Sequence, residues 1–126
     1  MFRFVLICCG GACGTGARYL LSTWIAKVSQ SAFPFGTLSV NLIGSFAIGL
    51  VMALALRNGS MTETTRVVLV TGVLGGFTTY SAFNYETIEL FRGGAAGMAL
   101  LYVGGTLAGC LVAGTLGAYL GTPSAS

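Results

Sequence analysis

The feature that most constrains this chain is how few charged residues it contains. Six Lys or Arg, three Asp or Glu and no His are spread over 126 residues, and no charged residue follows Arg92. Charged residues make up 7% of the chain, whereas soluble domains carry about 25%. So little charge cannot solvate the surface of a soluble domain, and six scattered cations cannot form the basic stripe of a nucleic-acid-binding protein. We therefore predict an integral membrane protein that does not bind nucleic acid.

Four stretches of the chain are long and apolar enough to cross a bilayer, which takes about 20 apolar residues in a helix. They lie at about 4–24, 37–56, 67–85 and 95–120, and the one charged residue inside them is Arg18. Their apolar runs are continuous, which indicates helices, because the strands of a membrane barrel alternate apolar and polar residues. We predict an all-α membrane protein, a single four-helix transmembrane subunit over residues 1–126, with no soluble domain.

The connections between these stretches contain helix breakers. Pro34 interrupts the chain before the second stretch, because proline cannot continue a helix. Asn58 and Gly59 form a turn signal after it, and Ser60 with Glu63 matches a capping box at the start of the third helix. We therefore expect the chain to cross the membrane four times.

The positive charges divide evenly between the two membrane faces. With four crossings, the face of the N-terminus holds Arg3, Arg57 and Arg66, and the opposite face holds Arg18, Lys27 and Arg92. Orientation normally follows the Lys and Arg bias, and three against three gives no preferred orientation. Two explanations stay open. The chain inserts both ways and assembles as an antiparallel dimer, or a feature other than charge sets its orientation.

Glycine is abundant inside the spans, with 20 residues in the whole chain. Small residues let helices approach closely in lipid, so we expect tight packing at three GxxxG pairs: Gly10 with Gly14, Gly72 with Gly76, and Gly105 with Gly109. Gly75 and Gly76 differ, because they stand mid-span close to Gly72 and weaken the helix by about 1 kcal/mol each. A break is tolerated only where freed carbonyls are buried in protein or face water or an ion. Plain packing and a functional break both remain open here.

The four cysteines lie within the spans, at Cys8, Cys9, Cys13 and Cys110. A metal site is conceivable, since Cys9 and Cys13 share a helix face. However, the chain has no His and no CxxC pair, and such pairs are typical of zinc sites. We interpret these cysteines as small apolar residues.

The three acids are placed at the ends of the spans. Glu63 is explained by helix capping, and Glu86 and Glu89 fall at the end of the third stretch. Proton-coupled transport needs a titratable group inside the membrane, and small multidrug exporters rely on a glutamate in the first helix, which is absent here. That transporter class is therefore disfavoured, and a non-transporting membrane assembly protein remains a second alternative.

The polar groups that remain inside the spans are almost all neutral. They are Thr37, Asn41, Thr78, Thr79, Tyr80, Ser81, Tyr102 and Thr106, with Phe83 and Cys110 on the same faces. Amide, hydroxyl and aromatic-edge hydrogens are electropositive and suit a small anion without trapping it. Alternatively a hydroxyl bonds the carbonyl four residues before it. We expect that for Thr15 and Thr115, but not for Asn41, which has no such partner.

At these residues the chain resembles the small fluoride channel family (Fluc, also called CrcB). Three segments carry the resemblance: GGACGTGARY from Gly10 to Tyr19, GTLSVN from Gly36 to Asn41, and TGVLGGFTTYSAF from Thr71 to Phe83. The resemblance implies a passive fluoride channel, not an enzyme, in the plasma membrane of a prokaryote. It also implies an antiparallel homodimer with a structural sodium ion at its centre, held by the backbone carbonyls of Gly75 and Thr78.

The resemblance further implies which side chains meet the ion. The fluoride pathway would comprise Thr37, Asn41, Tyr80, Ser81, Phe83, Tyr102, Thr106 and Cys110, with Arg18 near the vestibule. Two residues depart from the family pattern. The first pore aromatic, usually Phe, is Tyr80, and the residue before the second aromatic is Ala82 rather than Ser or Thr. Some members are heterodimers, but the even charge count favours a homodimer.

Overall fold

The computed structural model describes residues 1–59 and 61–122, and these residues form helices joined by short connections. The helices are α1 (Phe2–Ser29), α2 (Phe35–Asn58), α3 (Glu63–Val67), the π-helix η1 (Val68–Leu74), α4 (Gly75–Phe77), α5 (Tyr80–Arg92) and α6 (Ala96–Gly121). Within the described part, four segments are long and apolar enough to span a membrane: Phe2–Ser29, Phe35–Arg57, Glu63–Arg92 and Ala96–Gly121. The prediction of an all-α membrane protein with four spanning helices is confirmed.

The third spanning segment runs further than the sequence predicted. The apolar stretch was predicted at about 67–85, and the helix that contains its end, α5, continues to Arg92. Charged side chains limit an apolar run but do not stop a helix, and Glu89 pairs with Arg92 one turn later at 3.2 Å. The helix ends instead at Gly93 and Gly94, where Gly94 has a φ of 77°. Glu86 therefore lies inside α5, two turns before its end.

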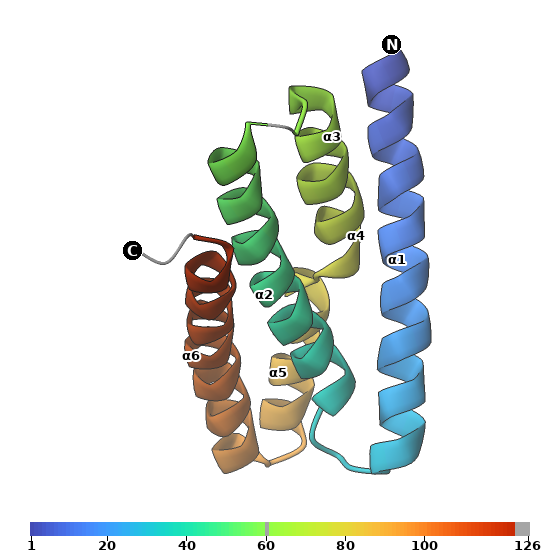
Figure 1. Ribbon diagram of the computed structural model, residues 1–126. Helices are drawn as coiled ribbons and strands as arrows, with labels where there is room; N and C mark the ends of the chain where they lie inside the picture. Colours follow the sequence, from blue (N-terminus) through green and yellow to red (C-terminus); the bar gives the residue numbers. More distant parts are fainter. Residues whose placement is uncertain (60, 123–126) are drawn as a thin grey trace.

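The helices run up and down in an antiparallel arrangement (Figure 1). The α1–α2 and α5–α6 connections lie at the end of the bundle opposite the start of α1. The most extensive packing is between α2 and α6, and α1 packs along η1 and α4. The bundle therefore consists of two close helix pairs, with α5 packed against α6 below the third segment's midpoint.

Glycines make both close helix pairs possible. A side chain on Gly14 would overlap the Val73 carbonyl, and one on Gly76 would press on the backbone of Gly11. On the other pair, a side chain on Gly117 would overlap the Phe46 carbonyl. The packing predicted for the first two GxxxG pairs is confirmed. In the third pair, a side chain on Gly109 would press on Leu42, whereas one on Gly105 would meet nothing within 4 Å in this chain.

Replacing Gly14 by Ala is expected to destabilise the bundle by about 1–3 kcal/mol, the usual cost of overpacking a tight contact. The added methyl group would meet the Val73 carbonyl, a backbone atom that cannot rotate away. Thermal unfolding of the detergent-solubilised protein measures the effect as a lower midpoint. Gly16→Ala is the matched control, because Gly16 lies on the same helix with nothing within 4 Å. Equal midpoints for the two variants would contradict the packing argument.

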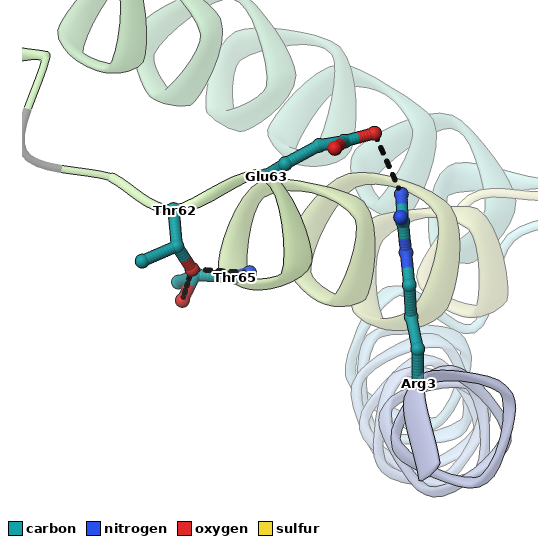
Figure 2. A network of polar contacts seen from close by, with 4 residues as sticks. All are labelled: Arg3, Thr62, Glu63 and Thr65. Carbon is teal, nitrogen blue, oxygen red and sulfur yellow. Dashed lines mark hydrogen bonds and ion pairs between the residues drawn. The ribbon is translucent and has the colours of Figure 1, made fainter. Parts of the chain in front are cut away.

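The start of α3 differs from the predicted capping box. Thr62 is the N-cap, and its hydroxyl accepts a hydrogen bond from the Thr65 amide at 3.1 Å, while Ser60 lies outside the described residues. Glu63 is the first residue of the helix and pairs with Arg3 of α1 at 3.1 Å (Figure 2). Both partners are well exposed, so this ion pair contributes little to stability. It joins the ends of two neighbouring helices at the face of the N-terminus.

Candidate functional site

The third spanning segment is interrupted near its middle. Thr78 (φ −78°, ψ 156°) and Thr79 (φ −150°, ψ 115°) have extended backbones between α4 and α5. Thr78 closes the preceding turn, because its amide and its hydroxyl both donate to the Leu74 carbonyl at 3.0 Å. The break lies just beyond Gly75 and Gly76, which remain helical in α4. Of the two interpretations left open by the sequence, the structure shows the break.

Asn41 of α2 holds the break in place. Its Nδ2 donates to the Thr79 carbonyl at 3.0 Å, and its Oδ1 accepts from the Thr79 amide at 2.8 Å. Gly44, one turn later on α2, permits this approach, since a side chain there would overlap Thr78. Asn41 is 8% exposed and Thr79 is equally buried. The expectation that Asn41 avoids its own helix is confirmed, and its second Nδ2 hydrogen carries no hydrogen bond within the described residues.

The Asn41 contact changes the hydrogen-bond partners of the surrounding backbone amides and carbonyls. In an unbroken helix the Thr79 amide would bond the Gly75 carbonyl, and here it bonds Asn41 instead. The Thr78 carbonyl receives no backbone hydrogen bond among the described residues. On the α1 side, the Thr15 hydroxyl donates to the Gly76 carbonyl at 3.4 Å, so the prediction that Thr15 bonds its own helix is wrong. Because α1 approaches the third segment closely at Gly11 and Gly14, the Thr15 hydroxyl lies within reach of the Gly76 carbonyl.

The hydroxyls next to the break have local partners. The Thr79 hydroxyl caps α5 by accepting from the Ala82 amide at 3.2 Å, and it lies 3.2 Å from the Ser81 hydroxyl. Thr115 of α6 donates to the Leu111 carbonyl at 2.8 Å, as predicted. Ser81 is therefore an exposed neighbour of the cap, and its hydroxyl is already engaged.

Glu86 forms a partly buried polar cluster that was not predicted from the sequence. The Thr37 hydroxyl donates to its Oε1 and the Tyr102 hydroxyl donates to its Oε2, both at 2.7 Å. Tyr102 is fully buried and Thr37 is 7% exposed. We call Thr37, Glu86 and Tyr102 the Glu86 cluster. It joins the first turns of α2 and α6 to α5, one helical turn from Asn41 and from Thr106.

Removing only the Tyr102 hydroxyl is expected to destabilise the protein by about 1.5–3 kcal/mol, because a hydrogen bond to a charged group is lost. Tyr102→Phe keeps the ring contacts and takes one donor from the Glu86 carboxylate. The midpoint of thermal unfolding in detergent reports the loss. Tyr119→Phe serves as the control, since Tyr119 is 75% exposed on the same helix. A midpoint unchanged in both variants would mean that this hydrogen bond contributes nothing.

Aromatic rings connect the Glu86 cluster to the break. The Phe83 ring lies 5.1 Å from the Tyr102 ring and 5.4 Å from the Tyr80 ring, measured between centroids. Phe83 is 5% exposed, whereas Tyr80 is 74% exposed. Tyr80 and Phe83 are therefore neighbours, as predicted. The isolated chain buries Phe83 but leaves Tyr80 exposed.

A groove of about 800 Å³ opens beside the break. Its wall includes eight predicted site residues or neighbours of the break: Asn41, Gly75, Thr78, Thr79, Tyr80, Phe83, Thr106 and Cys110. Most of the remaining wall is aliphatic, from residues such as Ile48, Leu107 and Leu111. Thr106 is 5% exposed, and its hydroxyl is the single buried side-chain polar atom without a hydrogen-bond partner among the described residues. An unpartnered buried hydroxyl is an available contact for a ligand.

Four predicted residues lie outside this groove wall in the structure, and one of them, Ser81, is the exposed neighbour of the α5 cap. Thr37 and Tyr102 belong to the Glu86 cluster, immediately beside it. Arg18 is half-buried on α1, which packs on the side of η1 and α4. The cluster itself had one usable signal in the sequence, because Glu86 follows Phe83 by three residues and therefore shares its helix face. The early predicted end of the third span concealed that spacing.

Comparison with known proteins assigns the chain to a family. Residues 5–118 match the model of the CrcB-like protein, Camphor Resistance (CrcB) family. The chain is 50% identical over 119 residues to a fluoride-specific ion channel FluC of Sorangium cellulosum (strain So ce56), covering 93% of this chain and 92% of that one.

Two further relatives carry the same name. A protein of Anaeromyxobacter sp. (strain K) is 47% identical over 113 residues, 90% of each chain. One of Thermus thermophilus is 45% identical over 119 residues, 94% of this chain and 93% of that one. With four spanning helices, a broken third segment and this similarity along its length, the chain is a multi-pass membrane protein that belongs to the CrcB-like family.

Proposed function

We propose that this chain is the subunit of a passive, fluoride-selective ion channel and has no enzymatic role. One observation carries the proposal. The polar side chains buried in this apolar bundle, Thr37, Asn41, Thr79 and Thr106, all lie along the surfaces where α2, α5 and α6 meet. Buried polar groups are expensive in a membrane and mark ion or substrate pathways. The relatives' shared name identifies the ion as fluoride.

We call the surfaces where α2, α5 and α6 meet the seam. The residues along this seam supply neutral contacts for a small anion. Asn41 offers its second amide hydrogen, Phe83 offers electropositive ring hydrogens, and the Thr106 hydroxyl has no other partner among the described residues. Cys110 continues the same face of α6. Such donors replace the hydration of fluoride without a full positive charge, so the ion is held weakly enough to leave. Ser81 and Tyr80 border this route at the start of α5, and Thr37 and Tyr102 border it at the Glu86 cluster.

The open groove supports an antiparallel homodimer. Non-helical backbone at mid-membrane is tolerated only where protein covers it or where it lines a water-filled cavity. In the isolated chain the groove beside Thr78 and Thr79 is uncovered, and Tyr80 is 74% exposed. A second copy laid across the groove in the opposite orientation would cover both. The even division of Lys and Arg between the faces favours insertion in both orientations.

The backbone at the break has the chemistry of a sodium site. The Gly75 carbonyl has lost its usual amide donor to Asn41, and the Thr78 carbonyl receives no backbone hydrogen bond among the described residues. Both residues line the groove that the second copy would cover. Two copies would therefore bring four carbonyl oxygens together, and oxygen ligands suit a hard cation. We propose that Gly75 and Thr78 hold a structural sodium ion that joins the subunits and is not transported.

The proposed location is the inner membrane of a bacterium. Fluoride enters cells as the neutral acid and dissociates inside, and a negative-inside potential then drives the anion out by about 2.3 kcal/mol per 100 mV. Arg18, half-buried on α1, would concentrate anions at the vestibule.

Efflux from liposomes containing the purified protein tests the proposed function. Fluoride-selective and chloride-selective electrodes follow each ion, with sodium present and with sodium replaced by a large organic cation. We expect rapid fluoride loss, retained chloride, and a lower fluoride rate without sodium. Retention of both ions in sodium would contradict the channel and favour a membrane assembly protein. Rapid fluoride loss that does not depend on sodium would contradict only the sodium site.

A further inference from the structure

The Glu86 cluster lies close to one membrane face, yet its Tyr102 ring is sealed from that face. Thr37 is the third residue of α2, and Tyr102 is the seventh of α6, about 9 Å from the start of that helix at 1.5 Å per residue. Tyr102 is nevertheless fully buried. Something outside the spanning helices must therefore cover its ring at this end of the bundle.

Phe33 of the α1–α2 connection provides that cover. Its ring stands edge-on to the Tyr102 ring, with a centroid distance of 5.5 Å and an interplanar angle of 80°. Phe35 supports it from the other side at 4.7 Å. The rings of Phe35, Phe33, Tyr102, Phe83 and Tyr80 thus form a continuous series from the connection to the break.

The connection holds Phe33 through local contacts alone. Gln30 ends α1 with a φ of 47°, the Phe33 amide donates to the Ser31 hydroxyl at 3.0 Å, and the Phe35 amide donates to the Phe33 carbonyl at 2.8 Å. Within the described residues no hydrogen bond joins Phe33 to α5 or α6. The ring is therefore held over Tyr102 by ring contacts, which a change of side-chain rotamer breaks.

We propose that Phe33 controls access to the pathway at this end of the subunit, covering the Tyr102 ring and moving aside when an anion passes. The Thr37 and Tyr102 hydroxyls donate to both oxygens of Glu86 and so screen its charge from the anion. The inference rests on the proposed channel function and adds a residue that the pore pattern does not contain. An aromatic ring suits the role, because its edge is electropositive toward an anion while its bulk keeps water from the buried Tyr102 ring. Selectivity is left to Phe83 and Asn41 deeper in the seam.

Hydroxyl-radical labelling followed by mass spectrometry tests the cover without requiring conduction. In Phe33→Ala, oxidation of Tyr102 is expected to rise at least threefold over the unaltered protein. Phe35→Ala is the matched control, because Phe35 begins α2 directly after the connection and contacts Phe33 but has no ring contact with Tyr102. Equal Tyr102 labelling in the unaltered protein and Phe33→Ala would overturn the proposal. If Phe33→Ala does not fold, Phe33→Leu replaces it, with a smaller rise expected.

Fluoride efflux from liposomes tests control of access. Phe33→Ala is expected to raise the fluoride rate severalfold with chloride still retained, and the larger ring of Phe33→Trp is expected to lower it severalfold. If Phe33 had only a structural role, both variants would release fluoride more slowly. Reduced fluoride rates in both variants would therefore overturn the proposal. Unchanged fluoride rates in both would also overturn it. Absence of fluoride flux from the unaltered protein would instead contradict the proposed channel, and labelling of Tyr102 would still decide whether Phe33 is the cover.

Discussion

Replacing Asn41 by Asp is expected to abolish fluoride conduction. The new carboxylate occupies the same volume at the centre of the seam, but it carries a negative charge where the anion must pass. Two like charges about 4 Å apart repel by about 4 kcal/mol at an effective dielectric constant of 20. Because each 1.36 kcal/mol is a factor of ten in rate, efflux should fall about a thousandfold. Fluoride efflux from liposomes measures the change.

The same substitution also disturbs the break. Asp lacks the Nδ2 group that donates to the Thr79 carbonyl at 3.0 Å, so two oxygens would face each other there. Asn84→Asp is the control for added charge, because Asn84 follows Phe83 on α5 but is exposed. The control should conduct and should fold normally. Efflux from Asn41→Asp equal to that of Asn84→Asp would remove Asn41 from the pathway.

Replacing Phe83 by Ile is expected to slow fluoride efflux by at least about tenfold, corresponding to about 1.4 kcal/mol. Phe83 is 5% exposed between the rings of Tyr80 and Tyr102, and it lines the same groove as Asn41. Its ring edge is electropositive toward an anion. Ile keeps most of the apolar volume but has no ring edge. The electrode assay used for Asn41 reads the rate directly.

A control on the same helix separates the ring edge from helix packing. Phe91 is 46% exposed near the end of α5, so Phe91→Ile makes the same chemical change away from the seam. Its efflux should match that of the unaltered protein. If Phe83→Ile also conducts at the unaltered rate, the Phe83 ring serves only to fill the core.

Much of the site was predictable because it follows from residue type and spacing. The shortage of charge required membrane helices, and the cluster of glycines before Thr78 indicated a break in the third one. Asn41 was identified because its amide has no partner on its own helix. Its true partner, the backbone of Thr79, was not predictable, since 38 residues separate them in the chain.

The acids show where prediction from sequence failed. Glu63 was interpreted as part of a capping box, and in the structure it pairs with Arg3 on another helix. Glu86 was placed at the end of a span, and in the structure it accepts hydrogen bonds from α2 and α6. The partners of these two acids lie on other helices, at separations of 60 and 49 residues for Arg3 and Thr37, whereas Glu89 pairs with Arg92 on its own helix. Local patterns carry no information about such contacts.

The sequence by itself determined the class of protein, the number of crossings and the need for a covered break, because these depend on hydrophobicity and backbone hydrogen bonding along a continuous segment. The tertiary structure alone decided which polar groups meet. Helix rotation and close approach at glycines bring Thr37, Asn41, Glu86 and Tyr102 together, and a rotation of one residue on any helix, about 100°, would separate them. The proposed pathway therefore depends on how the helices pack.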